Sequence, residues 1–284
     1  MPIVDDMTDF ADPDTAPRPV IGFGVAVVTD GMELEVHEHR KAQLLLAMRG
    51  VLTCEAADGL WIVPPQCAIW IPGGVRHSVK GLGAIEGYCL LIEPEAADTL
   101  PGACCTLSVT PLLRELVMRC ATFPVLYPEQ GAEAHLVALL LDELAVAPIE
   151  KLYLPMPSDS RLRAIADAMT TASADRPTVE AWAARAGVSE RTLSRIILKE
   201  TGMSFGRWRQ QFHIMLALHW LSKGAAVQTV ASDLGYESAG SFVTMFKKAL
   251  GSPPARYLAR RRNEYDRRLR SPPESRAPNA PPRS

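Results

Sequence analysis

The chain has 284 residues, of which 48% are hydrophobic and 22% charged, and its formal net charge is −2 at pH 7. This is about twice the usual domain length, so two domains with separate cores are expected. The composition excludes a collagenous or low-complexity chain, and no apolar run approaches the ~20 residues that a membrane span requires.

Charge is distributed unevenly along the chain. Residues 1–157 hold 9 Lys+Arg against 21 Asp+Glu, a net charge of −12, whereas residues 158–284 hold 21 against 11, a net charge of +10. This asymmetry indicates that only the second half meets a polyanion such as nucleic acid. The acidic first half would tend to repel it.

The two ends and the cysteines point to a cytoplasmic protein. Residues 1–19 are acidic and rich in proline, unlike a signal or transit peptide, and disorder is predicted for 1–19 and 266–284. All six cysteines lie in the acidic half without metal-binding spacing. We interpret them as small, reduced core residues, with the vicinal pair Cys104 and Cys105 as the one alternative place for a thiol sensor.

From Val20 to Glu93 the chain alternates short apolar runs with turn residues. Strands at spacings of 8 to 12 residues, separated by turn signals, predict an antiparallel barrel or sandwich. The turn signals are Gly31, Gly50, Asp58-Gly59, Pro64-Pro65, Gly73-Gly74 and Gly81.

Helical spacing of Leu and Val follows, over residues 110–122 and 131–147. The second helix is apolar around much of its circumference, so we expect it to be buried on two sides, within its domain or against another subunit. We assign residues 20–152 to one domain, with 108–147 as a helical segment suited to dimerisation. Prolines at 155 and 157 then predict a linker over 153–160.

Residues 178–198 predict a helix, a tight turn and a second helix. Thr178 and Ser189 are expected to cap the two helices, and Gly187 supplies the conformational freedom of the turn. The same pattern returns with Gly235 in the turn, and a long amphipathic helix, residues 205–224, lies between the two units. Two such units in a basic region predict DNA binding.

The segment GYESAGSFVTMFKKALGSPPARY resembles the signature of the AraC/XylS family of bacterial transcription regulators, and the resemblance covers residues 158–262. It implies an all-α DNA-binding domain, here assigned to 161–262, with seven helices and two recognition helices in major-groove segments ~34 Å apart. Two positions depart from the family, because Leu258 and His213 stand where arginine is common. The following arginines at 260–262 could compensate.

The outward positions of the two recognition helices are the predicted DNA contacts. On the first helix, arginine can donate to guanine and serine to several bases, whereas the second offers small groups and lysines, so unequal half-site specificity is expected. The alternative is that Arg191 and Arg195 form ion pairs with Glu190 and Glu200. The predicted contacts are Ser189, Arg191, Ser194, Arg195, Lys199, Ala239, Gly240, Ser241, Thr244, Lys247 and Lys248.

In the first half, the segment GMELEVHEHRKAQLLLAMRG and the later PGGVRH resemble the two motifs of the cupin β-barrel, over residues 20–92. His37 and His39 alternate along a predicted strand, so both should point inward, and His77 follows a turn that could return it to the same cavity. Metal-binding cupins hold a divalent metal at these positions together with a glutamate. Here Gln43 occupies the glutamate position.

Two interpretations of this cavity stay open. His37, His39 and His77, with the amide of Gln43, could bind zinc, nickel, copper or ferrous iron, although the missing carboxylate removes charge neutralisation. Alternatively, the four residues line an effector pocket for a small organic molecule, or hydrogen-bond one another. No cofactor is therefore certain.

The expected fold is α+β with two domains, and the expected function is transcription regulation in response to a small effector or metal. The first domain looks most like that of regulators with an N-terminal cupin, which often control a transporter or efflux gene. The expected partners are double-stranded DNA, the effector and a second copy of the chain. A metal-dependent cupin enzyme and an architectural DNA binder are the alternatives, and repression or activation stays open.

Overall fold

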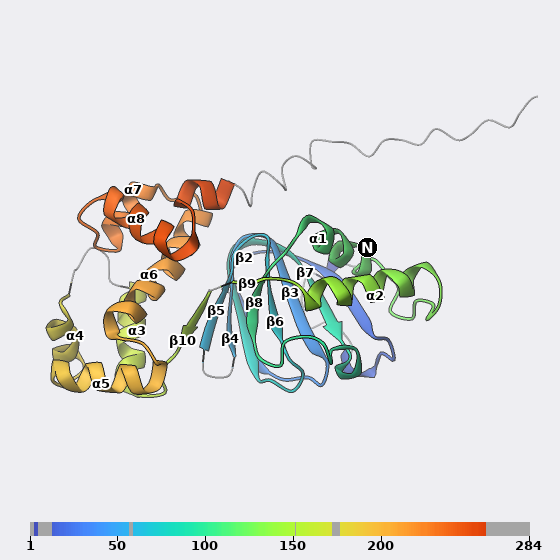
Figure 1. Ribbon diagram of the computed structural model, residues 1–284, viewed down its shortest axis with the longest axis horizontal. Coiled ribbons are helices and arrows are strands. Elements are labelled where there is room, and N and C mark those ends of the chain that lie inside the picture. Colours follow the sequence, from blue (N-terminus) through green and yellow to red (C-terminus); the bar gives the residue numbers. More distant parts are fainter. Residues whose placement is uncertain (1–2, 5–12, 57–58, 151, 172–176, 260–284) are drawn as a thin grey trace, which may run out of the picture.

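A computed structural model describes residues 3–4, 13–56, 59–150, 152–171 and 177–259. A β-barrel and two helices form the first half, and a bundle of helices lies beside the barrel and forms the second (Figure 1). The α+β, two-domain fold expected from the sequence is thus confirmed. None of the helices in the described ranges is long and apolar enough to cross a membrane.

The barrel is one mainly antiparallel sheet in the order β10-β5-β4-β7-β3-β6-β8-β9, with β2 paired to β7 and to the short β1. The long strand β7 pairs with β2 along most of its length, while its other edge is shared between β4 and β3. The strands are β1 (Ile3–Val4), β2 (Val20–His37), β3 (Ala42–Arg49), β4 (Leu52–Ala56), β5 (Gly59–Val63), β6 (Cys67–Ile71), β7 (His77–Ile92), β8 (Cys105–Ser108), β9 (Ile149–Glu150) and β10 (Tyr153–Pro155).

Strand β3 is buried on both faces because it separates two cores. Leu45 and Ala47 point into the barrel, whereas Leu44 and Leu46 pack beneath helices α1 (Pro111–Cys120) and α2 (Ala132–Ala145). Because side chains alternate along a strand, a strand covered on both faces shows a continuous apolar run. Such a run, LLLAM, is found here at residues 44–48.

Helix α2 is covered by the rest of the chain on one side rather than two. Val137, Leu140 and Leu144 are buried, whereas the side chain of Leu139 is 40% exposed and that of Val146, just after the helix, 74% exposed. Within the part of the chain that the structure describes, the second apolar side of α2 is therefore exposed.

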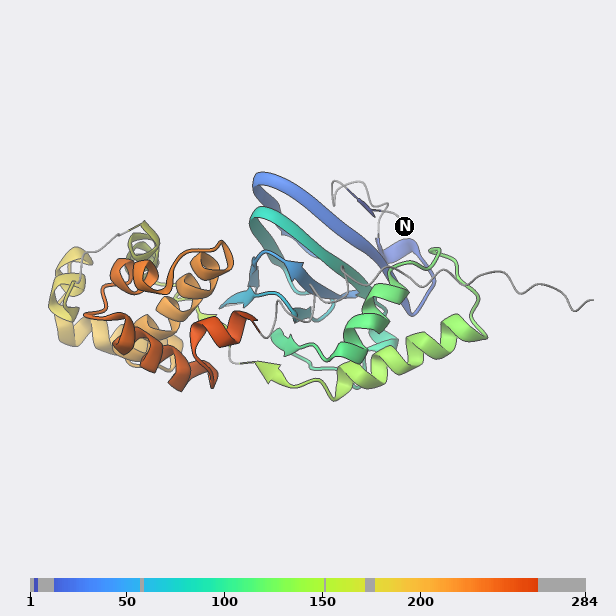
Figure 2. The same ribbon diagram turned by 90° about the horizontal axis from the view of Figure 1, so that it is seen from above.

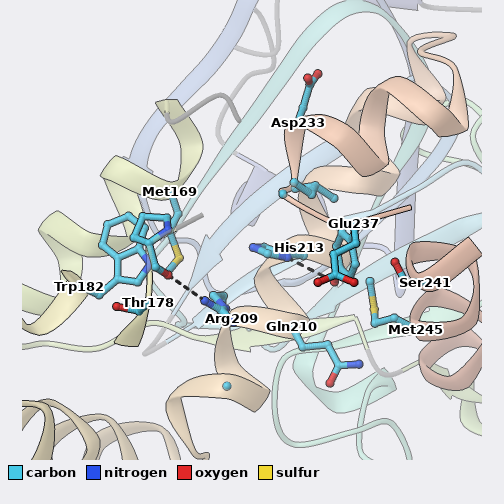
Figure 3. A pocket seen from close by; sticks show the side chains of 15 residues that line it. Met169, Thr178, Trp182, Arg209, Gln210, His213, Asp233, Glu237, Ser241 and Met245 are labelled. Carbon is cyan, nitrogen blue, oxygen red and sulfur yellow. Dashed lines mark hydrogen bonds between the residues drawn. The ribbon is translucent and has the colours of Figure 1, made fainter. Parts of the chain in front are cut away.

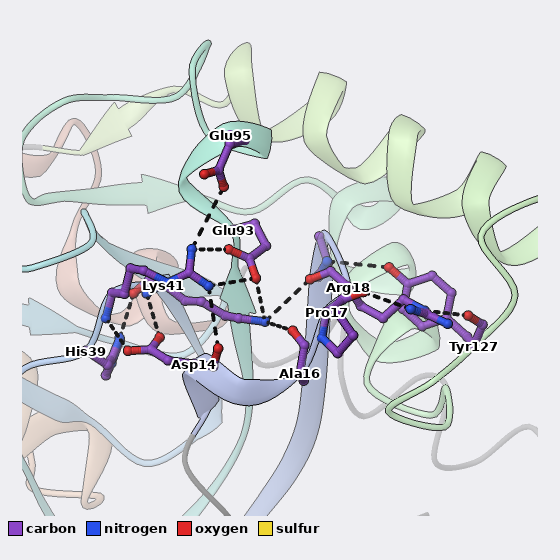
Figure 4. Close-up of polar contacts among 11 residues, drawn as sticks. Asp14, Ala16, Pro17, Arg18, His39, Lys41, Glu93, Glu95 and Tyr127 are labelled. Atoms are coloured by element: carbon purple, nitrogen blue, oxygen red, sulfur yellow. Dashed lines mark hydrogen bonds and ion pairs between the residues drawn. The ribbon is translucent and has the colours of Figure 1, made fainter.

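Residues 13–19 are held against the barrel, contrary to the disorder predicted for residues 1–19 (Figure 4). The Asp14 carboxylate accepts hydrogen bonds from the backbone N–H groups of Arg40 and Lys41. The fully buried Lys41 ammonium donates to the Ala16 carbonyl at 2.6 Å and pairs with Glu93 at 3.2 Å. These partners lie far along the chain, so local composition does not reveal them. The predicted disordered tail, 266–284, lies outside the described residues.

The second half contains seven helices within the described residues, as the family resemblance implies. Its two turns are built alike, because Gly187 and Gly235 adopt φ values of 66° and 75°, which glycine adopts at little cost. The helices are α3 (Ser160–Thr171), α4 (Val179–Arg185), α5 (Glu190–Thr201), α6 (Phe205–Ser222), α7 (Val227–Asp233), α8 (Ala239–Leu250) and a last helix at 254–259.

The junction between the halves is not a simple linker. The predicted linker, 153–160, begins with strand β10, which pairs with β5 and so belongs to the barrel sheet. The indole N–H of Trp208 in α6 donates to the Pro155 carbonyl at 2.9 Å, and the Gln211 amide donates to the Tyr153 carbonyl at 2.7 Å. The barrel and the helical half therefore meet through β10 and α6.

Candidate DNA-binding surface and histidine site

Helices α4 and α5 form the first helix-turn-helix unit. The Thr178 hydroxyl accepts from the Ala181 N–H and the Ser189 hydroxyl from the Thr192 N–H, so both helix starts are capped as the sequence predicts. Leu193 and Ile197 of α5 are fully buried. This burial fixes which face of α5 is turned away from the protein.

The outward face of α5 carries the predicted readers of the first unit. Arg191, Arg195 and Lys199 are exposed. Glu200, one of the acidic partners considered for these arginines, instead accepts a hydrogen bond from the Asp159 N–H at 3.1 Å. An exposed guanidinium on a helix set against a buried face is suited to donate to base edges in a major groove.

Helix α8, the corresponding helix of the second unit, has hydroxyl groups that already form hydrogen bonds within the helix or its cap. Ser238 caps the helix, and Ser241 completes a reciprocal capping box with it. The Thr244 hydroxyl donates to the Gly240 carbonyl at 2.9 Å within the same helix. The hydroxyls that the sequence singled out thus already have helix partners, whereas Lys247 and Lys248 are exposed.

Helix α6 separates the two units and borders a cavity of about 650 Å³ between them (Figure 3). Within it, a hydrogen bond of 3.3 Å joins His213 Nδ1 to the Tyr236 hydroxyl, and Arg209 donates to the Pro177 carbonyl. Burial, helped by the charge of Arg209, lowers the pKa of His213 to about 4. His213 is therefore neutral at neutral pH and does not replace the charge of the family's arginine.

Three histidines converge in the first half. One ligand atom from each of His37, His39 and His77 lies within 4.8 Å of the others. His37 and His77 face each other across β2 and β7, whereas β2 ends at His37 and His39 lies in the loop that follows. The prediction that both His37 and His39 lie on one strand was wrong, but the three side chains meet as expected.

The tautomers of these histidines are fixed by the backbone. Each Nδ1 contacts a carbonyl oxygen, which can only accept, so each Nδ1 carries a hydrogen. Nε2 of His37 and of His77 is left for another partner, whereas Nε2 of His39 already lies 3.2 Å from the Gln43 amide oxygen. The contacts are 2.8 Å from His37 to Glu35, 2.6 Å from His39 to Lys41 and 2.8 Å from His77 to Val75. Metal-binding histidines are commonly oriented through such a bond at the second ring nitrogen.

His77 shows most clearly that a partner is missing. Its Nε2 is buried and has no hydrogen-bond partner among the described residues. Burial, followed by the nearby His37 and His39, lowers the pKa of His77 to about 4, although the Val75 carbonyl opposes this shift. The imidazole is thus neutral and can offer its Nε2 lone pair to a cation.

Gln43 lies beside the cluster in place of a carboxylate. Its amide oxygen is 3.2 Å from His39 Nε2, and its amide nitrogen donates to Cys89 Sγ at 3.3 Å. Burial raises the pKa of the Cys89 thiol to about 12, so this thiol keeps its proton. Three imidazoles and an amide oxygen fit a divalent transition metal such as zinc, nickel, copper or ferrous iron.

The vicinal cysteines offer little support for a thiol sensor. All six cysteines are free. Burial raises the pKa of Cys104 and of Cys105 to about 11, so the reactive thiolate is scarce at neutral pH.

The barrel with its histidine cluster and the double helix-turn-helix half together define a DNA-binding regulator with a ligand-binding domain. Two family models match the chain: "AraC-like ligand binding domain" over residues 29–176 and "Helix-turn-helix domain" over residues 182–260. The chain belongs to the AraC family of HTH-type transcriptional regulators.

Two named regulators, NimR and RipA, agree with this assignment. The chain is 43% identical to the HTH-type transcriptional regulator NimR of Escherichia coli (strain K12), over 88% of this chain and 91% of NimR. It is 32% identical to the regulator RipA of Corynebacterium glutamicum, over 36% of this chain and 31% of RipA. The solved DNA-binding domain of AdpA, in complex with a target DNA, is 30% identical, covers 40% of this chain and 100% of that domain, and gives a TM-score of 0.34.

These matches decide between the classes considered for the chain. The matched relatives are named as transcriptional regulators, and a helix-turn-helix domain serves regulation rather than catalysis. The alternative of a metal-dependent cupin enzyme is therefore set aside.

Proposed function

We propose that the protein adjusts its affinity for operator DNA when the histidine site in the barrel is occupied. His37, His39, Gln43 and His77 form the effector site, and the three histidines hold a divalent transition metal ion there. The observation that carries the proposal is the convergence of three ligand atoms within 4.8 Å, with every Nδ1 engaged by a backbone carbonyl. A bound ion would supply a positive centre at which a small effector can coordinate.

In this proposal, α5 and α8 enter successive major-groove segments of the operator. Arg191, Ser194 and Arg195 read base edges, while Ser189 and Lys199 of the same unit contact the backbone. The second unit grips phosphates through Lys247 and Lys248 and approaches closely at its small residues, Ala239, Gly240, Ser241 and Thr244. The hydrogen bonds that Ser241 and Thr244 already make within α8 and its cap support this unequal division.

The acting form in this proposal is a homodimer in the cytoplasm, where the operator is found. The open apolar side of α2, with the exposed Leu139 and the neighbouring Val146, supports self-association. A two-fold axis would pair the same helix from both copies.

Metal binding and operator binding test the proposal together. Titration with Zn²⁺, followed by calorimetry, is expected to show one ion bound per wild-type chain and at least a hundredfold weaker binding by His77→Ala. His135→Ala is the matched control, because His135 lies exposed on α2. Footprinting on operator DNA at a stated salt concentration, with and without Zn²⁺, is expected to show a change in affinity. A wild-type protein that binds no divalent transition metal would contradict the metal site.

A further inference from the structure

A continuous row of paired residues crosses the barrel from the histidine site to the DNA-binding half. Each residue of this row faces the next across a pair of neighbouring strands, and the last carbonyl accepts the indole N–H of Trp208 in α6 at 2.9 Å. The cross-barrel row comprises His37, His77, Ala56, Gly59 and Pro155.

The row is closely packed from His77 onward, whereas His37 is half-buried. His77 and Ala56 are 1% and 2% exposed. A Cβ atom added at Gly59 would lie 2.0 Å from the Tyr153 ring, and that ring packs on Trp61 with centroids 4.8 Å apart. Closely packed segments shift together rather than deform independently, so a displacement at His77 has a physical route to β10.

Helix α6 holds the open edge of β10 at two points. Carbonyls two residues apart on a strand point to the same edge, and the carbonyls of Tyr153 and Pro155 accept from Gln211 and Trp208. Trp208 is fully buried. Because α6 also joins the two helix-turn-helix units, a movement of β10 would change how both units face the operator (Figure 2).

A further polar contact joins the barrel to the helical half at β4, and it is weaker than the contacts of β10 with α6. Arg163 of α3 pairs with Glu55 at 3.5 Å, and both side chains are about half exposed. Exposed ion pairs of this kind contribute little free energy. The buried contacts of Trp208 and Gln211 are therefore the better coupling points.

Metal binding would act directly on the first two residues of the row. Two imidazoles bound tetrahedrally to one ion at ~2.0–2.1 Å have their nitrogens about 3.4 Å apart. The three ligand atoms here span up to 4.8 Å. Occupancy would thus contract the cluster by at most on the order of 1 Å, and the row begins at two of its three histidines, His37 and His77.

We propose that the cross-barrel row couples occupancy of the histidine site to the position of α6, with Trp208 and Gln211 as the positioning residues. This inference rests on the proposed function of the histidine site. The coupling is the difference in operator affinity between the protein with an occupied histidine site and the protein with an empty one. Trp208 and Gln211 can transmit it without touching the metal or the DNA.

The test compares Zn²⁺ binding with Zn²⁺-dependent operator binding in the full-length protein. Trp208→Phe keeps an aromatic ring but removes the N–H donor, and Gln211→Ala removes the second donor. Trp220→Phe, the same change on the same helix, is the control. In the wild type and in Trp220→Phe, Zn²⁺ is expected to change operator affinity by about tenfold or more.

In the double variant of Trp208→Phe and Gln211→Ala, Zn²⁺ affinity and metal-free operator affinity are expected to stay within about threefold of the wild type, which shows that both halves are folded. The Zn²⁺-dependent change is expected to fall below about twofold. A double variant that keeps the full change would overturn the coupling while leaving the proposed function intact. A wild type that binds no Zn²⁺ would overturn both.

Discussion

Polar atoms on the two recognition helices differ in how many are already engaged within the protein. On α5 the guanidinium groups of Arg191 and Arg195 are exposed, whereas on α8 the hydroxyls of Ser241 and Thr244 have helix partners. A side chain whose hydrogen bonds are satisfied internally gains less from a base edge than a free one. Sequence discrimination is therefore expected to concentrate in the first unit.

Arg195→Ala tests this expectation. The change is expected to relax discrimination at one base-pair position by about 1–3 kcal/mol, because a bidentate contact to guanine is lost. Lys248→Ala, the comparison from the second unit, should weaken binding to all sequences alike. Selection from a randomised operator library measures both, and an unchanged preference at every position in Arg195→Ala would refute the assignment.

His213 gives the helical half a dependence on pH. Its pKa in the folded protein is lowered to about 4 from an ordinary value of 6.5, mainly by burial. Between these values the unfolded chain binds more protons than the folded one, so stability falls as the pH falls through this window. The loss between pH 7 and pH 5 is about 2 kcal/mol.

Urea unfolding of the wild type and of His213→Gln at pH 7, 6 and 5 checks this. The difference in unfolding free energy between the two proteins should shrink or reverse toward pH 5, since only the wild type carries this histidine. His77, whose pKa is lowered similarly, is present in both and cancels. Parallel pH profiles would count against a neutral, buried His213.

At the scale of elements, each helix-turn-helix unit depends on a glycine in a left-handed conformation. Gly187 has a φ of 66°, and a Cβ added there would meet nothing within 4 Å. Any cost of a side chain at this position is therefore conformational rather than steric crowding. The starts of α4 and α5 do not depend on this glycine, because the Thr178 and Ser189 side chains cap them.

Gly187→Ala is expected to destabilise the protein by about 1–2 kcal/mol, the cost of a left-handed alanine. Gly206→Ala is the matched control. Gly206 lies inside α6, where an added Cβ also meets nothing within 4 Å, so this change should be neutral or slightly stabilising. Thermal unfolding of both variants distinguishes them, and equal effects would contradict the conformational explanation.

For the whole molecule, the uneven charge and the exposed apolar side of α2 assign DNA binding to the second half and self-association to the first. The half with a net charge of +10 carries both helix-turn-helix units, and the half with −12 carries the barrel and α2. The acidic barrel would be repelled by DNA, which leaves α2 free to meet a second copy.

Leu139→Glu is expected to shift the protein from dimer to monomer, because it places a charge on the apolar side of α2 that dimerisation would bury. Leu198→Glu is the comparison, since Leu198 is also exposed, at 55%, but lies on α5. Sedimentation velocity without DNA measures both. A wild-type protein that is monomeric at micromolar concentration would contradict the homodimer.

Local sequence determined the type and order of the elements. Alternating apolar runs with turn residues predicted an all-β first half, but the turns predicted at Gly31 and Gly81 were wrong, because β2 and β7 run through them. The repeated turn glycine predicted α4–α5 and α7–α8, because this signal acts within a few residues. The convergence of His37, His39 and His77 was also predicted, from the resemblance to cupins.

Tertiary structure decided what depends on partners distant in the chain. The ordering of residues 13–19 by the buried Lys41 and the pairing of β10 with β5 both come from such contacts. The helix over 205–224 was predicted as amphipathic, but no local pattern shows that the Trp208 N–H meets Pro155. Hydrogen bonds across long sequence separations leave no periodic signal, so only the fold reveals them.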